Sequence, residues 1–147
     1  MSLYKRVLVP LDGSPTSDSA LDQAIALARL CEASLVVVMV YDPYPYIAAA
    51  AEYASYQAQL AEDLRREVEQ TVSAARKKVE AAGLQVSTQV LDAQRVWRAI
   101  LDVAQAEQVD LIVMGSHGRS GLDKLVMGSV TQRVLQHTHL PVLVVRE

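Results

Sequence analysis

Three glycines at a fixed spacing mark the segment GSHGRSGLDKLVMGS, residues 115–129, as the part of the chain most able to bind a ligand. Gly115, Gly118 and Gly121 leave backbone N–H groups unobstructed by Cβ atoms and allow tight turns, and loops of this kind cradle phosphate oxygens. Ser129 is predicted to begin a helix, whose unpaired N–H groups and positive dipole end attract an anion. The spacing indicates an anion or phosphate site, with a flexible surface loop as the alternative.

Two common phosphate-binding motifs do not describe this segment. A Walker A motif needs Gly-x4-Gly-Lys-Ser/Thr, but Lys124 is followed by Leu125 and lacks the required glycine before it. The dinucleotide-binding glycines should follow the first strand of a fold, whereas these follow the later apolar run 111–114. The segment therefore predicts a phosphate loop of another type.

The histidines do not indicate a catalyst. His117 lies within the glycine segment, but no Ser-His-Asp order with a nucleophile elbow accompanies it. We expect it to position the loop rather than to transfer protons. His137 and His139 are expected at the end of the last helix, in a solvated or capping role, and Trp97 is expected to pack on the core.

Hydrophobic patterns predict the elements that hold this segment. Apolar runs without alternation are typical of parallel strands buried on both faces, and they occupy residues 7–11, 35–41, 111–114 and 141–145. The segment LQVSTQVL alternates, as a half-covered strand does. Helical spacing predicts a helix begun by Ser14 and Pro15, a long helix packed along one stripe from Tyr53 to Ala82 and stopped by Gly83, a helix around 96–103, and one from about Ser129.

This order of elements predicts a single α/β domain over residues 1–147, with an open parallel sheet and helices on both faces. Ligands of such sheets bind beyond the carboxyl ends of the strands, where PLDGS, residues 10–14, and the glycine segment are both expected. A net charge of −3 gives no broad positive field for nucleic acid or membrane. A single cysteine and no apolar targeting or spanning segment favour a cytoplasmic protein.

Tyrosines and prolines are concentrated in YDPYPYIAAAAEYASY, which follows the second predicted strand. Pro43 and Pro45 are expected to prevent helix formation until about Ile47. Tyrosine suits positions where one end of the ring is buried and the other is wet, so a lid or a docking surface is predicted. Packing of the segment onto the long helix is the alternative.

The pattern Gly115-x2-Gly118-x9-Gly128-Ser129, with VLVPLDGS near the start and LPVLVVR near the end, resembles the universal stress protein family over nearly the whole chain. The resemblance implies a Rossmann-like sheet, of the adenine nucleotide alpha hydrolase-like type, with strand order 3-2-1-4-5. It also places the chain with the branch of that family that binds ATP.

The resemblance assigns roles to individual residues. Asp12 would hydrogen-bond the ribose or reach Mg²⁺ held mainly by the phosphates, whereas an N-terminal cap for the first helix is its alternative role. Val40 and Met114 would contact adenine, and backbone N–H groups of the glycine segment would surround the phosphates, with hydroxyl donors from Ser129 and Thr131. The full implied set is Pro10, Leu11, Asp12, Val40, Met114, Gly115, Ser116, His117, Gly118, Arg119, Gly128, Ser129, Val130 and Thr131.

The function implied is a nucleotide-dependent signalling or regulatory switch, in which ATP, ADP or AMP orders the loop from Gly115 to Gly128 and changes the surface shown to a protein partner. A slow ATPase or another nucleotide-processing enzyme is an alternative, although neither a paired acid nor an arginine finger is recognisable. A dimeric scaffold that needs no nucleotide is another. The last strand, in LPVLVVRE, is expected at the edge of the sheet, where it would pair with its twin in a homodimer.

Overall fold

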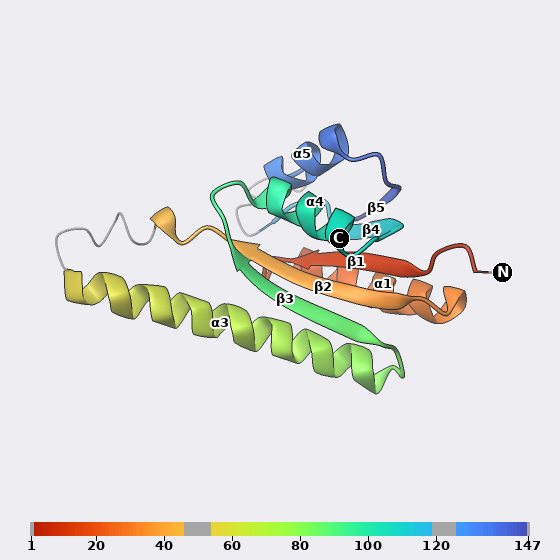
Figure 1. The fold of residues 1–147 in the computed structure, drawn as a ribbon, viewed down its shortest axis with the longest axis horizontal. Coiled ribbons are helices and arrows are strands. Elements are labelled where there is room, and N and C mark those ends of the chain that lie inside the picture. Colours follow the sequence, from red (N-terminus) through yellow and green to blue (C-terminus); the bar gives the residue numbers. More distant parts are fainter. Residues whose placement is uncertain (1, 46–53, 119–125, 147) are drawn as a thin grey trace.

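Five strands and the helices between them form one parallel α/β sheet structure (Figure 1). The computed structural model describes residues 2–45, 54–118 and 126–146. The elements are β1 (Arg6–Leu11), α1 (Pro15–Cys31), β2 (Ser34–Tyr41), α3 (Ala54–Ala81), β3 (Val86–Asp92), α4 (Val96–Ala106), β4 (Leu111–Gly115), α5 (Ser129–His137) and β5 (Val142–Val145). The sheet order is β3-β2-β1-β4-β5, which confirms the predicted order 3-2-1-4-5.

The central strands are apolar throughout because helices cover both of their faces. Val7 and Val9 of β1 pack with α1 and the second half of α3 on one face, whereas Leu8 packs with α4 and α5 on the other. β1 leads to α1 on the first face, while the chain after β4 leads to α5 on the opposite face. The neighbouring strands β1 and β4 therefore form the switch point at which such sheets bind ligands.

The beginning of α1 follows the prediction. Ser14 is the N-cap residue, and its hydroxyl accepts a hydrogen bond from the N–H of Ser17 at 3.2 Å. Pro15 occupies the first helical position, where the missing N–H costs nothing. The predicted stop of the long helix is also present: just after the C-terminal end of α3, Gly83 adopts a φ of 79°, as expected of a helix stop.

The long helix α3 differs from the prediction of one stripe packed along its whole length. Val68, Val72 and Val79 are buried, but Tyr56 is 62% exposed and Leu60 is 40% exposed. A helix of 28 residues is about 42 Å long, whereas the 8 residues of β2 span about 26 Å. The first turns of α3 therefore project beyond the end of the sheet (Figure 1). No described helix combines the length and the apolar composition that a bilayer crossing requires.

The segment after β2 also departs from the sequence analysis. The backbone is already helical at Tyr44 and Pro45, so the prediction that helix waits until about Ile47 is wrong. The carboxylate of Asp42 accepts the N–H of Tyr44 at 2.9 Å, as a helix cap does, and proline is tolerated in a first turn. Residues 46–53, which form the middle half of the predicted lid or docking surface, lie outside the described residues.

Candidate functional site

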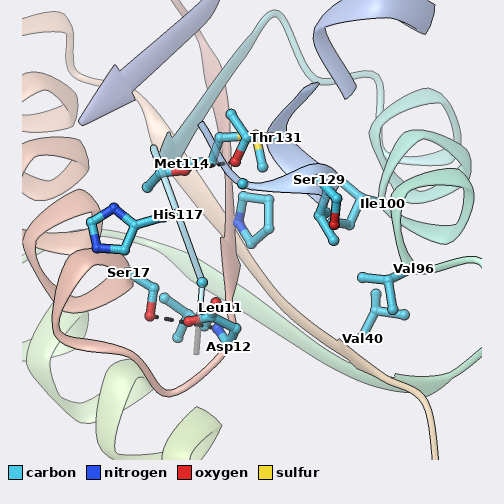
Figure 2. A pocket seen from close by; sticks show the side chains of 15 residues that line it. Leu11, Asp12, Ser17, Val40, Val96, Ile100, Met114, His117, Ser129 and Thr131 are labelled. Carbon is cyan, nitrogen blue, oxygen red and sulfur yellow. Dashed lines mark hydrogen bonds between the residues drawn. The ribbon is translucent and has the colours of Figure 1, made fainter. Parts of the chain in front are cut away.

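A cavity of about 230 Å³ lies at the carboxyl ends of β1 and β4, where the sequence predicts a ligand site (Figure 2). The predicted residues that line it are Pro10, Leu11, Asp12, Val40, Met114, Gly115, His117, Gly118, Gly128, Ser129, Val130 and Thr131. Ser116 does not line the cavity, and Arg119 lies outside the described residues. Residues far apart in the chain thus meet around one cavity because parallel strands end at the same edge of the sheet.

Asp12 holds the loop between β1 and α1 while lining the cavity. Its Oδ1 accepts the N–H of Ser14 at 2.9 Å, and its own N–H donates to the hydroxyl of Ser17 at 3.5 Å. The cap of α1 is Ser14, so the alternative role of Asp12 as that cap is not what the structure shows. The Oδ2 atom faces Gly118, because a Cβ added at Gly118 would collide with it. Asp12 therefore joins the two loops that form the cavity.

The glycines of the segment are needed mainly for space. A Cβ at Gly115 would lie 2.8 Å from Cγ2 of Thr16, and one at Gly128 would lie 3.1 Å from Cα of His117. Among the described glycines, only Gly13 and Gly83 have positive φ angles. The tight turning expected of the segment is therefore not visible at these glycines, whereas the close backbone approach is.

The end of β4 is fixed to three neighbours. The N–H of Ser116 donates to the carbonyl of Val145 at 2.8 Å, and the carbonyl of Ser116 accepts the N–H of Gly128 at 2.7 Å. Ser116 is therefore a buried structural residue, which explains why it does not line the cavity. The hydroxyl of Thr131 donates to the carbonyl of Gly115 at 2.8 Å, so the donor expected from Thr131 is already used within the protein.

His117 links the same loop to α1. Its Nε2 lies 3.0 Å from the hydroxyl of Thr16, and its Nδ1 lies 3.1 Å from the hydroxyl of Ser116. Both ring nitrogens are thus engaged by neutral hydroxyl groups, and no carboxylate of a described residue hydrogen-bonds to the ring. This arrangement supports the predicted positioning role and gives no support to acid–base catalysis.

The first turn of α5 is the main source of free hydrogen-bond donors at the cavity. Gly128 is the N-cap residue, and no side chain among the described residues caps this helix. Ser129, Val130 and Thr131 line the cavity, and the first N–H groups of a helix have no partner within the helix. A bound anion would satisfy these donors and interact favourably with the helix dipole.

The opposite part of the cavity is apolar. Val40 from β2 and Met114 from β4 lie there as predicted, and Val96 and Ile100 from α4 complete the wall (Figure 2). In the sequence, Val96 and Ile100 show only helical periodicity, and no pattern singles out Ser17, which also lines the cavity. Their position was implied by the fold, since the helix after β3 must cross the sheet beside the switch point.

Few ionisable groups face the cavity. Among the described lining residues, only Asp12 and His117 can carry a charge. The described residues hold no group of three or more histidine, cysteine or carboxylate side chains placed to bind a metal. The geometry therefore suits a ligand with one apolar end and one anionic end, held mainly by packing and by backbone donors.

The fold and the cavity define a single-domain α/β protein with a cavity at the carboxyl edge of a parallel sheet. The model of the universal stress protein family matches residues 3–146. The chain is also 34% identical over 146 residues to universal stress protein MJ0531 of Methanocaldococcus jannaschii, covering 99% of this chain and 84% of that protein. The chain belongs to the universal stress protein family.

Solved structures agree with this assignment. The structure of MJ0577, a universal stress protein of Methanocaldococcus jannaschii, matches with a TM-score of 0.84 at 30% identity and covers 99% of this chain and 97% of that one. A universal stress protein solved in complex with cAMP matches with a TM-score of 0.67 at 26% identity, covering 99% and 98%. The similarity thus extends over the whole domain.

Proposed function

We propose that the protein binds an adenine nucleotide, ATP above all, in the cavity between β1 and β4 and acts as a nucleotide-dependent regulatory switch. The observation that carries the proposal is the uncapped start of α5, which meets the apolar wall of the same cavity. The related universal stress protein in complex with cAMP supports an adenine nucleotide as the ligand class.

The lining residues fit the parts of ATP in turn. The base lies against Val40 and Met114, where apolar side chains line the cavity. Asp12 accepts a hydrogen bond from the ribose, and the N–H groups of Ser129 and Val130, in the first turn of α5, bind the phosphates. Bound Mg²⁺ neutralises phosphate charge and is held mainly by phosphate oxygens, because Asp12 is the only described lining residue with a carboxylate.

The regulatory role follows from the position of the ligand. ATP would contact Gly118 and Gly128, which stand at the two sides of the segment between β4 and α5. Occupancy therefore changes the surface that this segment shows to a protein partner. The protein acts in the cytoplasm in this proposal, since its single cysteine suits a reducing compartment.

The proposal includes a homodimer through the free edge of β5. Among the strands that the structure describes, β5 pairs only with β4, and Leu143 is 41% exposed. An apolar strand edge is a template for pairing with another chain, and pairing with a second copy satisfies its backbone groups.

Isothermal titration calorimetry with Asp12→Asn tests nucleotide binding. We expect the parent protein to bind ATP with Mg²⁺ at micromolar strength or weaker, and the variant to bind about tenfold more weakly, because one charge-assisted hydrogen bond is lost. Asparagine retains the acceptor for the N–H of Ser14, so the loop should be preserved. Asp18→Asn is the matched control, because Asp18 is exposed in the first turn of α1 and does not line the cavity.

Equal ATP affinity of Asp12→Asn and the parent protein would place the nucleotide elsewhere. Absence of ATP binding to the parent protein would end the proposal. Mass spectrometry of small molecules released from the purified protein by heat identifies the nucleotide that it carries.

A further inference from the structure

A second cavity adjoins the first on the side of α4 and α5. Its volume is about 580 Å³, which lies within the usual range for small-molecule sites. Val96, Ser129 and Val130 line both cavities, so the two cavities meet at these residues. A ligand whose phosphates lie at the start of α5 can therefore extend from the first cavity into the second.

Two arginines give the second cavity a positive character. Arg95 stands just before α4 and Arg133 lies in the second turn of α5, and both side chains line the cavity. Neither guanidinium forms an ion pair or hydrogen bond with another described residue. The one carboxylate in the lining, that of Asp42, accepts the N–H of Tyr44. Two unpaired guanidinium groups against one carboxylate favour an anionic ligand that carries planar groups.

The remaining lining residues suit a nucleoside. Trp97 lines the cavity, and its indole stacks on the imidazole of His137 with ring centroids 4.3 Å apart, which fixes the orientation of the ring. The side-chain amide of Gln94 offers both a donor and acceptors for the polar edge of a base. Aromatic rings and guanidinium planes are surfaces on which bases stack. The cavity thus contains groups for a base as well as groups for phosphate.

We propose that the protein binds dinucleoside polyphosphates across both cavities, with one adenosine in the first cavity, the phosphate bridge over Ser129 and Val130, and the second nucleoside in the second cavity. The inference rests on the proposed function, since the first adenosine occupies the site proposed for ATP. It extends that function from mononucleotides to a ligand with two nucleosides. Arg95 and Arg133 hold the bridge and the second nucleoside, whereas the first cavity holds the rest.

Calorimetry with three ligands tests the proposal, each in the presence of Mg²⁺: ATP, adenosine 5′-tetraphosphate and diadenosine tetraphosphate. We expect diadenosine tetraphosphate to bind at least about tenfold more tightly than either mononucleotide, because only it places a nucleoside in the second cavity. The double variant Arg95→Gln/Arg133→Gln should reduce this advantage to about twofold or less. Arg98→Gln, which removes the same charge from α4 outside the second cavity, should leave the advantage intact.

Trp97 provides an independent readout, because it is the only tryptophan of the chain and lines the second cavity. Its fluorescence should change on titration with diadenosine tetraphosphate and much less with ATP. Equal affinities for all three ligands would overturn this inference while leaving ATP binding in place. So would an advantage of diadenosine tetraphosphate that survives the double variant, or one that adenosine 5′-tetraphosphate shares. Failure of every ligand to bind would overturn the proposed function as well.

Discussion

Two helices begin at the same cavity, and their first turns are built differently. The start of α1 is satisfied from within, because Ser14 caps it and Pro15 lacks an N–H to be satisfied. The start of α5 has glycine at the cap position, and no side chain in the described part of the chain caps it. A capped helix end gains stability from its own residues, whereas an uncapped end at a cavity leaves its donors for a ligand. The difference indicates that the β1–α1 junction supports the site and that the β4–α5 junction binds.

Giving α5 a cap of its own should have the largest effect. In Gly128→Asp, the new carboxylate accepts the free N–H groups of the first turn and repels the phosphates of a ligand. We expect ATP affinity to fall by at least about a hundredfold, measured by calorimetry, because the donors are occupied and a like charge is added. The helix itself should keep its stability, since aspartate is a favourable cap residue.

Gly128→Ala distinguishes the effect of the added carboxylate from the effect of the added Cβ atom. A Cβ at this position lies 3.1 Å from Cα of His117, so alanine causes the same close contact without adding a charge. Alanine should weaken ATP binding much less than aspartate does. Parental ATP affinity in Gly128→Asp, with the fold retained by circular dichroism, would show that the start of α5 does not bind the phosphates.

The chain continues from α5 into β5, the strand at the open edge of the sheet. Proline substitution in β5 tests whether this edge pairs with a second copy of the chain. The carbonyl of Pro141 accepts a hydrogen bond from Ile112 of β4, and that of Val145 accepts one from Ser116, just after β4. Because alternate residues of a strand direct their backbone groups to opposite sides, those of Val144 face the open side. Val144→Pro removes a donor from that side only. By light scattering, we expect the parent protein at twice the 16.1 kDa of one chain and the variant at the mass of one chain.

Leu143→Pro is the matched control on the same strand. Its backbone N–H faces β4, so proline there should lower the thermal stability of the single chain in addition to any effect on association. A parent protein with the mass of one chain at micromolar concentration would contradict the dimer. A Val144→Pro variant that remains dimeric would move the interface away from β5.

The same contrast shows what sequence could predict here. Ser14 and Pro15 define the start of α1 locally, and buried parallel strands form uninterrupted apolar runs, so the helix start and the positions of the central strands were predictable. The strand order came from the resemblance to the family, and the structure confirms it. The residues that form the walls of the cavity were harder to predict from the sequence. Val96 and Ile100 have the spacing of core residues, and periodicity identifies an apolar face without showing whether protein or ligand lies against it.

The remaining differences have the same physical origin. The sequence correctly identifies the apolar stripe of α3, but Tyr56 and Leu60 on that stripe are exposed. The length of the sheet determines how much of the stripe is covered, and no pattern within α3 reports that length. Thr131 was expected to offer its hydroxyl to a ligand, yet it donates to Gly115, a residue 16 positions away in the chain. Contacts between distant segments decide both cases, and a single sequence does not encode them as a local pattern.

The smallest expected effect on binding is that of removing the cap of α1 in Ser14→Ala. The hydroxyl of Ser14 accepts the N–H of Ser17, and Ser14 is only 4% exposed. Alanine at this position therefore leaves the buried N–H of Ser17 without an acceptor. The free energy of unfolding should fall by about 1 kcal/mol in urea denaturation. ATP affinity should change by less than about twofold, because Ser14 does not line the cavity.

Ser19→Ala, in the interior of α1, is the control and should not destabilise the protein, since alanine favours helix. A loss of ATP affinity in Ser14→Ala as large as that in Gly128→Asp would mean that both helix starts bind the ligand, and the distinction between a supporting and a binding junction would have to be given up.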